Sequence, residues 1–103
     1  MSESVLIVDE IASSREELAR ALDAEGFQVV QSDSTSAAVR DIWANQFLVV
    51  YIASVLSDTK PVALSEQLQQ MAPEIETIIF SKGDSRSKLA RKASGIRDGH
   101  IAA

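Results

Sequence analysis

The acidic pair Asp9 and Glu10 offers the most recognisable chemistry in this chain, because it follows directly after a short apolar run. Carboxylate oxygens are ligands that Mg²⁺ accepts, but Mg²⁺ gives up its water reluctantly, so two carboxylates alone hold it weakly. We favour solvated side chains, or a negative charge at the N-terminus of the following helix, as the role of the pair. No cofactor, and no metal beyond weak Mg²⁺ binding, is therefore expected.

Other reactive side chains are few, since the chain has no cysteine and a single histidine, His100. Disulfides, cysteine nucleophiles, thiolate metal sites and multi-histidine metal centres are therefore excluded. His100 belongs to the residue type that titrates near neutral pH, but a lone histidine at a strand start is expected to be a packing residue. The hydroxyl of Ser81, which follows another apolar run, is expected to cap a turn.

Charge is distributed unevenly along the chain, whose net charge is −5. Residues 1–81 carry four basic and thirteen acidic residues, whereas residues 82–103 carry six basic and two acidic residues. The centre of the basic cluster consists of Arg86, Lys88, Arg91 and Lys92. An acidic body with one basic face favours an acidic protein partner over nucleic acid, because the body repels phosphates. A solvated helix face is the equally weighted alternative.

Short apolar runs alternate with stretches of helical periodicity along the whole chain. Strands are predicted over residues 5–8, 27–31, 47–53 and 77–80, with a fifth beginning at 100–101. Helices are predicted over residues 14–25, around 38–43, over 61–71 and over 85–94.

Local signals set the expected helix ends and faces. Ser14 and Glu17 have the spacing of a capping box at the start of the first helix. Gly26 and Gly95 are expected to follow the ends of the first and fourth helices. The stripe of the second helix that is expected to face the core consists of Ala38, Val39, Ile42 and Trp43.

Strands that alternate with helices of this length predict an α/β fold, with a parallel sheet covered by helices on both faces. Functional sites in such sheets lie beyond the carboxyl ends of the strands. The residues expected there are Asp9 and Glu10, Ala53 and Ser54, Ser81 and Lys82, and Ala102 and Ala103.

The length of 103 residues predicts one domain, spanning residues 1–103. The apolar runs are far shorter than the roughly 20 residues that a membrane-spanning helix needs. No basic start followed by an apolar run predicts a signal peptide. We expect a cytoplasmic protein that does not contact a membrane.

The ordered set of these features resembles the receiver domain of response regulators over essentially the whole chain. The resemblance rests on residues 5–10, on residues 25–29 and on the alanine-rich second helix. Ser81 falls at the family's hydroxyl position after strand four, and His100 falls at its switch aromatic on strand five. The resemblance implies a flavodoxin-like, doubly wound, five-stranded parallel sheet with the order 2-1-3-4-5.

Two groups that the family uses for phosphotransfer are missing. In the family, an aspartate ending strand three accepts the phosphoryl group, the acidic pair holds Mg²⁺, and a lysine after strand five contacts the phosphoryl oxygens. Here Ala53 holds the acceptor position, or Ser54 if the register shifts by one, and Ala103 holds the lysine position. The resemblance therefore predicts a degenerate receiver of bacterial phosphorelay signalling, with a vestigial acidic pocket and no enzymatic activity.

The expected partner surface is the fourth helix and the fifth strand, where Arg86, Lys88, Arg91 and Lys92 would contact an acidic protein. Receivers normally carry a fifth helix beside the first, and here no residues remain to form it. We therefore expect an uncovered apolar face near strands four and five, filled by further chain, by a partner or by a second copy.

Two other hypotheses stay open. A phosphorylatable regulator would use a displaced acceptor such as Asp58, several residues past the strand end. A small-ligand binder would use the crevice at the strand ends, although the chain lacks the glycine-rich loop expected of a phosphate site.

Overall fold

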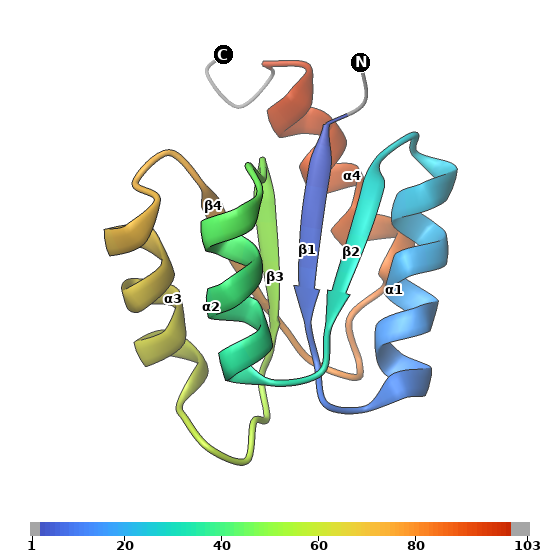
Figure 1. Ribbon diagram of the computed structural model, residues 1–103. Helices are drawn as coiled ribbons and strands as arrows, with labels where there is room; N and C mark the ends of the chain where they lie inside the picture. The colour runs from blue at the N-terminus through green and yellow to red at the C-terminus, as the bar shows by residue number, and fades with distance from the viewer. Residues whose placement is uncertain (1–2, 100–103) are drawn as a thin grey trace.

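The computed structural model describes residues 3–99, in which four strands alternate with four helices (Figure 1). The strands are β1 (Ser4–Val8), β2 (Gln28–Ser32), β3 (Val49–Ala53) and β4 (Glu76–Phe80). The helices are α1 (Ala12–Ala24), α2 (Thr35–Ala44), α3 (Pro61–Met71) and α4 (Arg86–Arg97).

The strands form one parallel sheet with the order β2-β1-β3-β4. Val8 is in register with Ser32 on one side and with Ile52 on the other, and Ala53 is in register with Phe80. The carboxyl ends of all four strands therefore lie at one edge of the sheet, as predicted for a parallel α/β fold.

Helices cover both faces of this sheet, with α1 and α4 on one face and α2 and α3 on the other (Figure 1). Successive side chains of a strand point to opposite faces of the sheet, so the core has two halves. In β1, Val5 and Ile7 face α1 and α4, whereas Leu6 and Val8 face α2 and α3. All five residues of β3 are buried, which explains why its sequence reads as a continuous apolar run.

Several local signals act as predicted. Gly26 follows α1 with a φ of 91°, a conformation that glycine adopts without strain. The hydroxyl of Ser34 accepts a hydrogen bond from the Ala37 N–H at the start of α2, and Pro61 is the first residue of α3. The capping box at Ser14 is wrong, because α1 begins two residues earlier, after Ile11, which makes no side-chain cap.

The five-stranded sheet is not observed, since residues 3–99 supply only four strands. The fifth strand was expected at His100 and Ile101, which lie outside the described residues. The fourth helix is also longer than predicted, because Gly95 lies within it and Gly99, with a φ of 78°, follows its end. The extra turn is stabilised by Arg97, whose guanidinium stacks 4.5 Å from the Phe27 ring centroid and whose Nη1 donates to the Glu25 carbonyl.

Helix α4 packs beside α1, on the face that we expected to be uncovered. Leu89, Ala90 and Ala93 of α4 are buried against the sheet. The Tyr51 hydroxyl, on β3, donates to the Leu89 carbonyl at 2.5 Å and so ties the helix to the sheet centre. The expected uncovered face is thus filled on this side, while on the opposite face Ile79 of β4 remains 41% exposed.

The second helix differs from its prediction at one position, since Trp43 is 78% exposed rather than part of the inner stripe. Ala38 and Ile42 face the sheet, and a residue directly after Ile42 is rotated by about 100° around the helix axis. Among the described residues, every helix is too short or too polar to cross a membrane.

Candidate functional site at the carboxyl edge of the sheet

An open pocket of about 470 Å³ lies where the carboxyl ends of β1, β3 and β4 meet. Its wall is mainly apolar, with contributions from Ile11, Val55 and Phe80. Asp9 and Lys82 also line it, and Asp9 is the one carboxylate among the lining residues. The structure therefore brings the ends of three strands together at one site, where sequence reasoning placed it.

Asp9 is the polar floor of this pocket and is only 3% exposed. Its Oδ1 accepts a hydrogen bond from the Ile11 N–H at 2.9 Å, and its backbone carbonyl accepts one from Arg15 Nη1 at 2.8 Å. The carboxylate therefore shapes the turn that leads into α1. The expectation of a solvated Asp9 side chain is wrong, because this side chain is buried.

Glu10, the second member of the acidic pair, is exposed and turns away from the pocket. Its Oε2 accepts hydrogen bonds from the Ser57 N–H at 2.9 Å and from the Ser57 hydroxyl at 2.8 Å. These bonds link the β1–α1 loop to the β3–α3 loop. Asp9 and Glu10 are thus used separately, and nowhere in residues 3–99 do three potential metal ligands of the His, Asp or Glu type gather.

Ala53 is the last residue of β3 and is 7% exposed. The next residue, Ser54, is exposed and donates its backbone N–H to the Phe80 carbonyl at 2.7 Å. The strand therefore ends where the sequence placed its end, and the side chain that it presents to the pocket is a methyl group. A methyl group has no lone pair with which to attack phosphorus.

Asp58 lies in the β3–α3 loop and does not line the pocket. Its Oδ1 accepts a hydrogen bond from the Thr35 hydroxyl at 2.8 Å, so it is held against the first residue of α2. The Asp58 carboxylate is therefore bonded outside the pocket.

Lys82 shares the pocket with Asp9, since β4 adjoins β3 in the sheet and parallel neighbours end at the same edge. Both residues were expected at this edge from the sequence. Ser81 is exposed, and its N–H is the donor to Asp84 Oδ2 at 2.9 Å. The Ser81 hydroxyl was expected to cap this turn, but the backbone N–H makes the bond instead.

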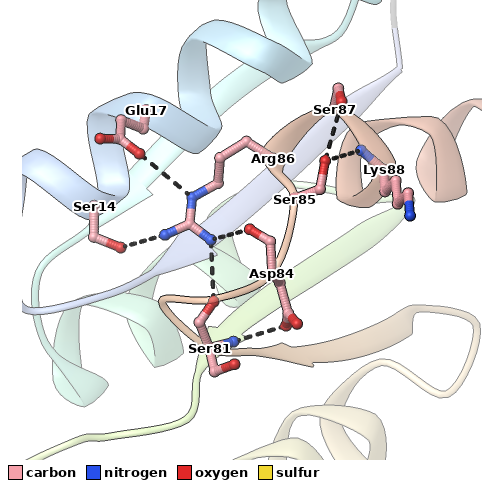
Figure 2. A network of polar contacts seen from close by, with 8 residues as sticks. All are labelled: Ser14, Glu17, Ser81, Asp84, Ser85, Arg86, Ser87 and Lys88. Carbon is pink, nitrogen blue, oxygen red and sulfur yellow. Dashed lines mark hydrogen bonds and ion pairs between the residues drawn. The ribbon is translucent and has the colours of Figure 1, made fainter.

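Arg86 is the centre of a network that joins α4 to α1 (Figure 2). Its Nη2 donates to the Ser14 hydroxyl at 3.1 Å, and its Nη1 donates to the Ser81 carbonyl at 3.1 Å. Its guanidinium also lies 5.3 Å from the Phe80 ring centroid and 3.8 Å from the Glu17 carboxylate. The side chain is only 15% exposed, so Arg86 is an internal link rather than the surface contact that we expected.

The other three basic residues of the expected partner surface, Lys88, Arg91 and Lys92, are exposed on α4. Lys88 uses its backbone N–H to complete the Ser85 cap, which leaves its ammonium group outside the network (Figure 2). The remaining expected site positions, His100 and Ala103, lie outside the described residues.

Comparison with solved structures gives full-length matches. A CheY-like response regulator receiver domain from Methanospirillum hungatei JF-1 matches with a TM-score of 0.86 and 15% identity, over 100% of both chains. A BeF3-activated DrrB receiver domain matches with a TM-score of 0.85 and 13% identity, over 95% of this chain and 99% of that chain. No family model and no curated protein matches the sequence.

The fold is that of a response-regulator receiver domain. At identities this low, the likeness establishes the fold and leaves function to be argued from the site. A structure described as an adenylate cyclase from Rhodopirellula baltica also matches, with a TM-score of 0.84 and 16% identity, over 99% of this chain and 93% of that chain. Structures with this fold therefore carry different functional descriptions. The function of this chain is accordingly argued from the residues of its pocket.

Proposed function

We propose that this receiver fold is a degenerate member of its class, a pseudo-receiver that works as a protein interaction module in bacterial two-component signalling. The observation that carries the proposal is Ala53 at the end of β3, in the wall of the pocket where phosphotransfer would take place. Without a carboxylate there, an acyl phosphate has no atom on which to form. The module is proposed to act in the cytoplasm.

The rest of the pocket supports the same reading. The Asp9 carboxylate already accepts a backbone hydrogen bond, and Glu10 is bonded to Ser57 outside the pocket. The pair is therefore poorly arranged to hold Mg²⁺ together, and metal is not part of the proposal. Lys82 could neutralise an anion in the pocket, but a lysine without an acceptor transfers nothing.

The partner is proposed to be an acidic protein that contacts α4. Lys88, Arg91 and Lys92 are exposed on this helix, whereas most of the acidic residues lie in residues 1–81. Opposite charge speeds association and selects orientation more than it adds affinity, so this surface suits a transient signalling contact. Arg86 is left out of the surface because its guanidinium is used inside the molecule.

Mass spectrometry of the intact protein after incubation with acetyl phosphate and Mg²⁺ tests the proposal. We expect no mass gain, while a receiver with an acceptor aspartate, treated alongside, gains one phosphoryl group. The Asp58→Asn variant serves as the matched control. A phosphoryl gain in the wild type that Asp58→Asn abolishes would replace the proposal with the displaced-acceptor alternative.

The partner surface is tested separately by NMR titration of the ¹⁵N-labelled protein with poly-glutamate. Amide shifts are expected on α4 at low salt, and they should disappear at high salt because exposed charges are screened. The triple variant Lys88→Glu, Arg91→Glu, Lys92→Glu should show none of these shifts. Shifts that survive in the triple variant would place the acidic contact elsewhere on the molecule.

A further inference from the structure

Trp43 is the most conspicuous side chain that the proposed function does not use. It is the single tryptophan of the chain, and 78% of it is exposed near the C-terminal end of α2. Its neighbour Ile42 is 8% exposed, so the helix already buries its apolar face without Trp43. Tryptophan is among the residue types that contribute most to protein interfaces, and it is rarely left this exposed.

A hollow of about 280 Å³ lies directly beside this tryptophan, between the ends of α2 and α3. Trp43 forms part of its rim, and Phe47, Met71 and Ile75 contribute apolar surface to its wall. Binding sites for small organic ligands usually start at about 300 Å³. The hollow is therefore better matched to one large side chain than to a cofactor.

The same surface carries one exposed group of each charge. Arg40 lies one helical turn before Trp43, on the same side of α2, and its side chain is 75% exposed. Its only ion pair within residues 3–99 is a 3.8 Å contact with the adjacent Asp41. Glu74 lies on the opposite rim of the hollow and is exposed.

We infer that this surface binds a second copy of the chain about a two-fold axis. A two-fold interface must be complementary to itself, because the same patch faces its own copy. Here one patch holds an apolar projection and a hollow of mixed polar and apolar lining, and also a cation and an anion. In the dimer, Trp43 of each copy would cover the hollow of the other, and Arg40 of each copy would face Glu74 of the other.

This dimer would use a different surface from the proposed acidic-partner contact. Trp43 lies on α2, on the opposite face of the sheet from α4 (Figure 1). The two associations are therefore compatible. A dimer would present two basic α4 surfaces to a partner at once, which raises the effective concentration of the second surface once the first is bound.

Sedimentation equilibrium and tryptophan fluorescence over a concentration series test the inference. Because Trp43 is the only tryptophan, its emission reports on this surface alone. We expect a monomer–dimer equilibrium in which the emission shifts to shorter wavelength as the dimer forms. A protein that stays monomeric, with unshifted emission, throughout the series would overturn the inference, whatever the phosphorylation experiment shows.

Variants assign the contact to these residues. Trp43→Ala should remain monomeric with unchanged circular dichroism, since the side chain is already exposed, whereas Val62→Ala, at another exposed apolar residue, should dimerise as the wild type does. Arg40→Glu and Glu74→Arg should each weaken dimerisation by about tenfold, and the double variant should restore it. A dimer that persists in Trp43→Ala, or a double variant no better than either single one, would contradict the inference.

Discussion

Two charged side chains that sequence reasoning placed at the surface are turned into the molecule and hold its loops. Asp9 supports the turn into α1, and Arg86 connects the start of α4 to Ser14 and to the Ser81 carbonyl. Burial of a charged group is costly unless its hydrogen bonds are satisfied. The Asp9 carboxylate accepts one backbone hydrogen bond, and the Arg86 guanidinium donates through both terminal nitrogens while its buried Nε has no hydrogen-bond partner. Both residues are therefore expected to stabilise the fold rather than to bind a partner.

Asp9 provides the first test at this scale. Asp9→Ala removes the acceptor for the Ile11 N–H and should lower the free energy of unfolding by about 1–2 kcal/mol. Asp9→Asn keeps an oxygen at the same place and should lower it by less, as urea denaturation would measure. Mg²⁺ should leave the midpoint of urea denaturation of the wild type unchanged. A midpoint that rises with Mg²⁺ in the wild type but not in Asp9→Ala would show that Asp9 helps to bind the metal.

Arg86 gives a second, paired comparison. Arg86→Ala should lower the free energy of unfolding by about 1–3 kcal/mol, because it breaks a part-buried network and leaves Phe80 without its stacked guanidinium. Lys88→Ala, two residues away and exposed, should change it by less than about 0.5 kcal/mol. Equal losses in the two variants, measured by thermal and urea denaturation, would contradict the internal role of Arg86.

At the scale of elements, the packing of α4 beside α1 covers one face of the sheet. A sheet face left bare at β3 and β4 would expose Tyr51 and Phe80, which are buried here. Tyr51 donates to the Leu89 carbonyl and meets Phe80 edge to face, at 6.4 Å between ring centroids. The helix is therefore positioned by a specific polar bond as well as by apolar contact.

Burial raises the pKa of the Tyr51 phenol far above its usual value of 10.0. In the folded state, the Tyr51 phenol therefore keeps its proton at a pH where the unfolded chain releases it. The contribution of this phenol to folding stability is complete below about pH 10 and is lost as the pH rises further. Tyr51→Phe should lower stability by about 1 kcal/mol at neutral pH and should flatten the loss of stability above pH 10. The measurement is urea denaturation from neutral to strongly alkaline pH; equal alkaline slopes for wild type and variant would contradict this role.

Sequence reasoning worked where the signal was local. The four strands of the described chain, the glycine after α1 and the proline that starts α3 follow from short-range patterns, and all are observed. It failed where the outcome depended on distant contacts. The length of α4 depends on Arg97 reaching Phe27 and Glu25, and the outward position of Trp43 depends on which face of α2 meets the sheet.

The candidate site was predictable to a similar extent. A parallel sheet places Asp9, Ala53 and Ser81 at one edge whatever its details, and the pocket lies at this edge. The hydrogen-bond partners of the nearby charged residues could not be predicted from the sequence. Glu10 bonds to Ser57, Asp58 to Thr35 and Arg86 to Ser14, and each pair is distant in sequence and meets only in the folded chain.

The whole molecule has the fold of response-regulator receivers, as its full-length structural matches show. Its sheet has four strands within the described residues, one fewer than the sequence resemblance implied. At the carboxyl edge, however, the strand that should present a nucleophile ends in Ala53. The proposal made above rests on this difference: we propose that the molecule signals through its surfaces without receiving a phosphoryl group.

The most direct test is the ¹H–¹⁵N correlation spectrum of the protein with and without beryllofluoride and Mg²⁺, which together imitate a phosphorylated receiver. We predict that the amide signals of Asp9, Ala53, Ser81 and Lys82 do not move at any concentration of the reagent. Saturable shifts of these signals would mean that the pocket accepts a phosphoryl-like group, and they would contradict the account.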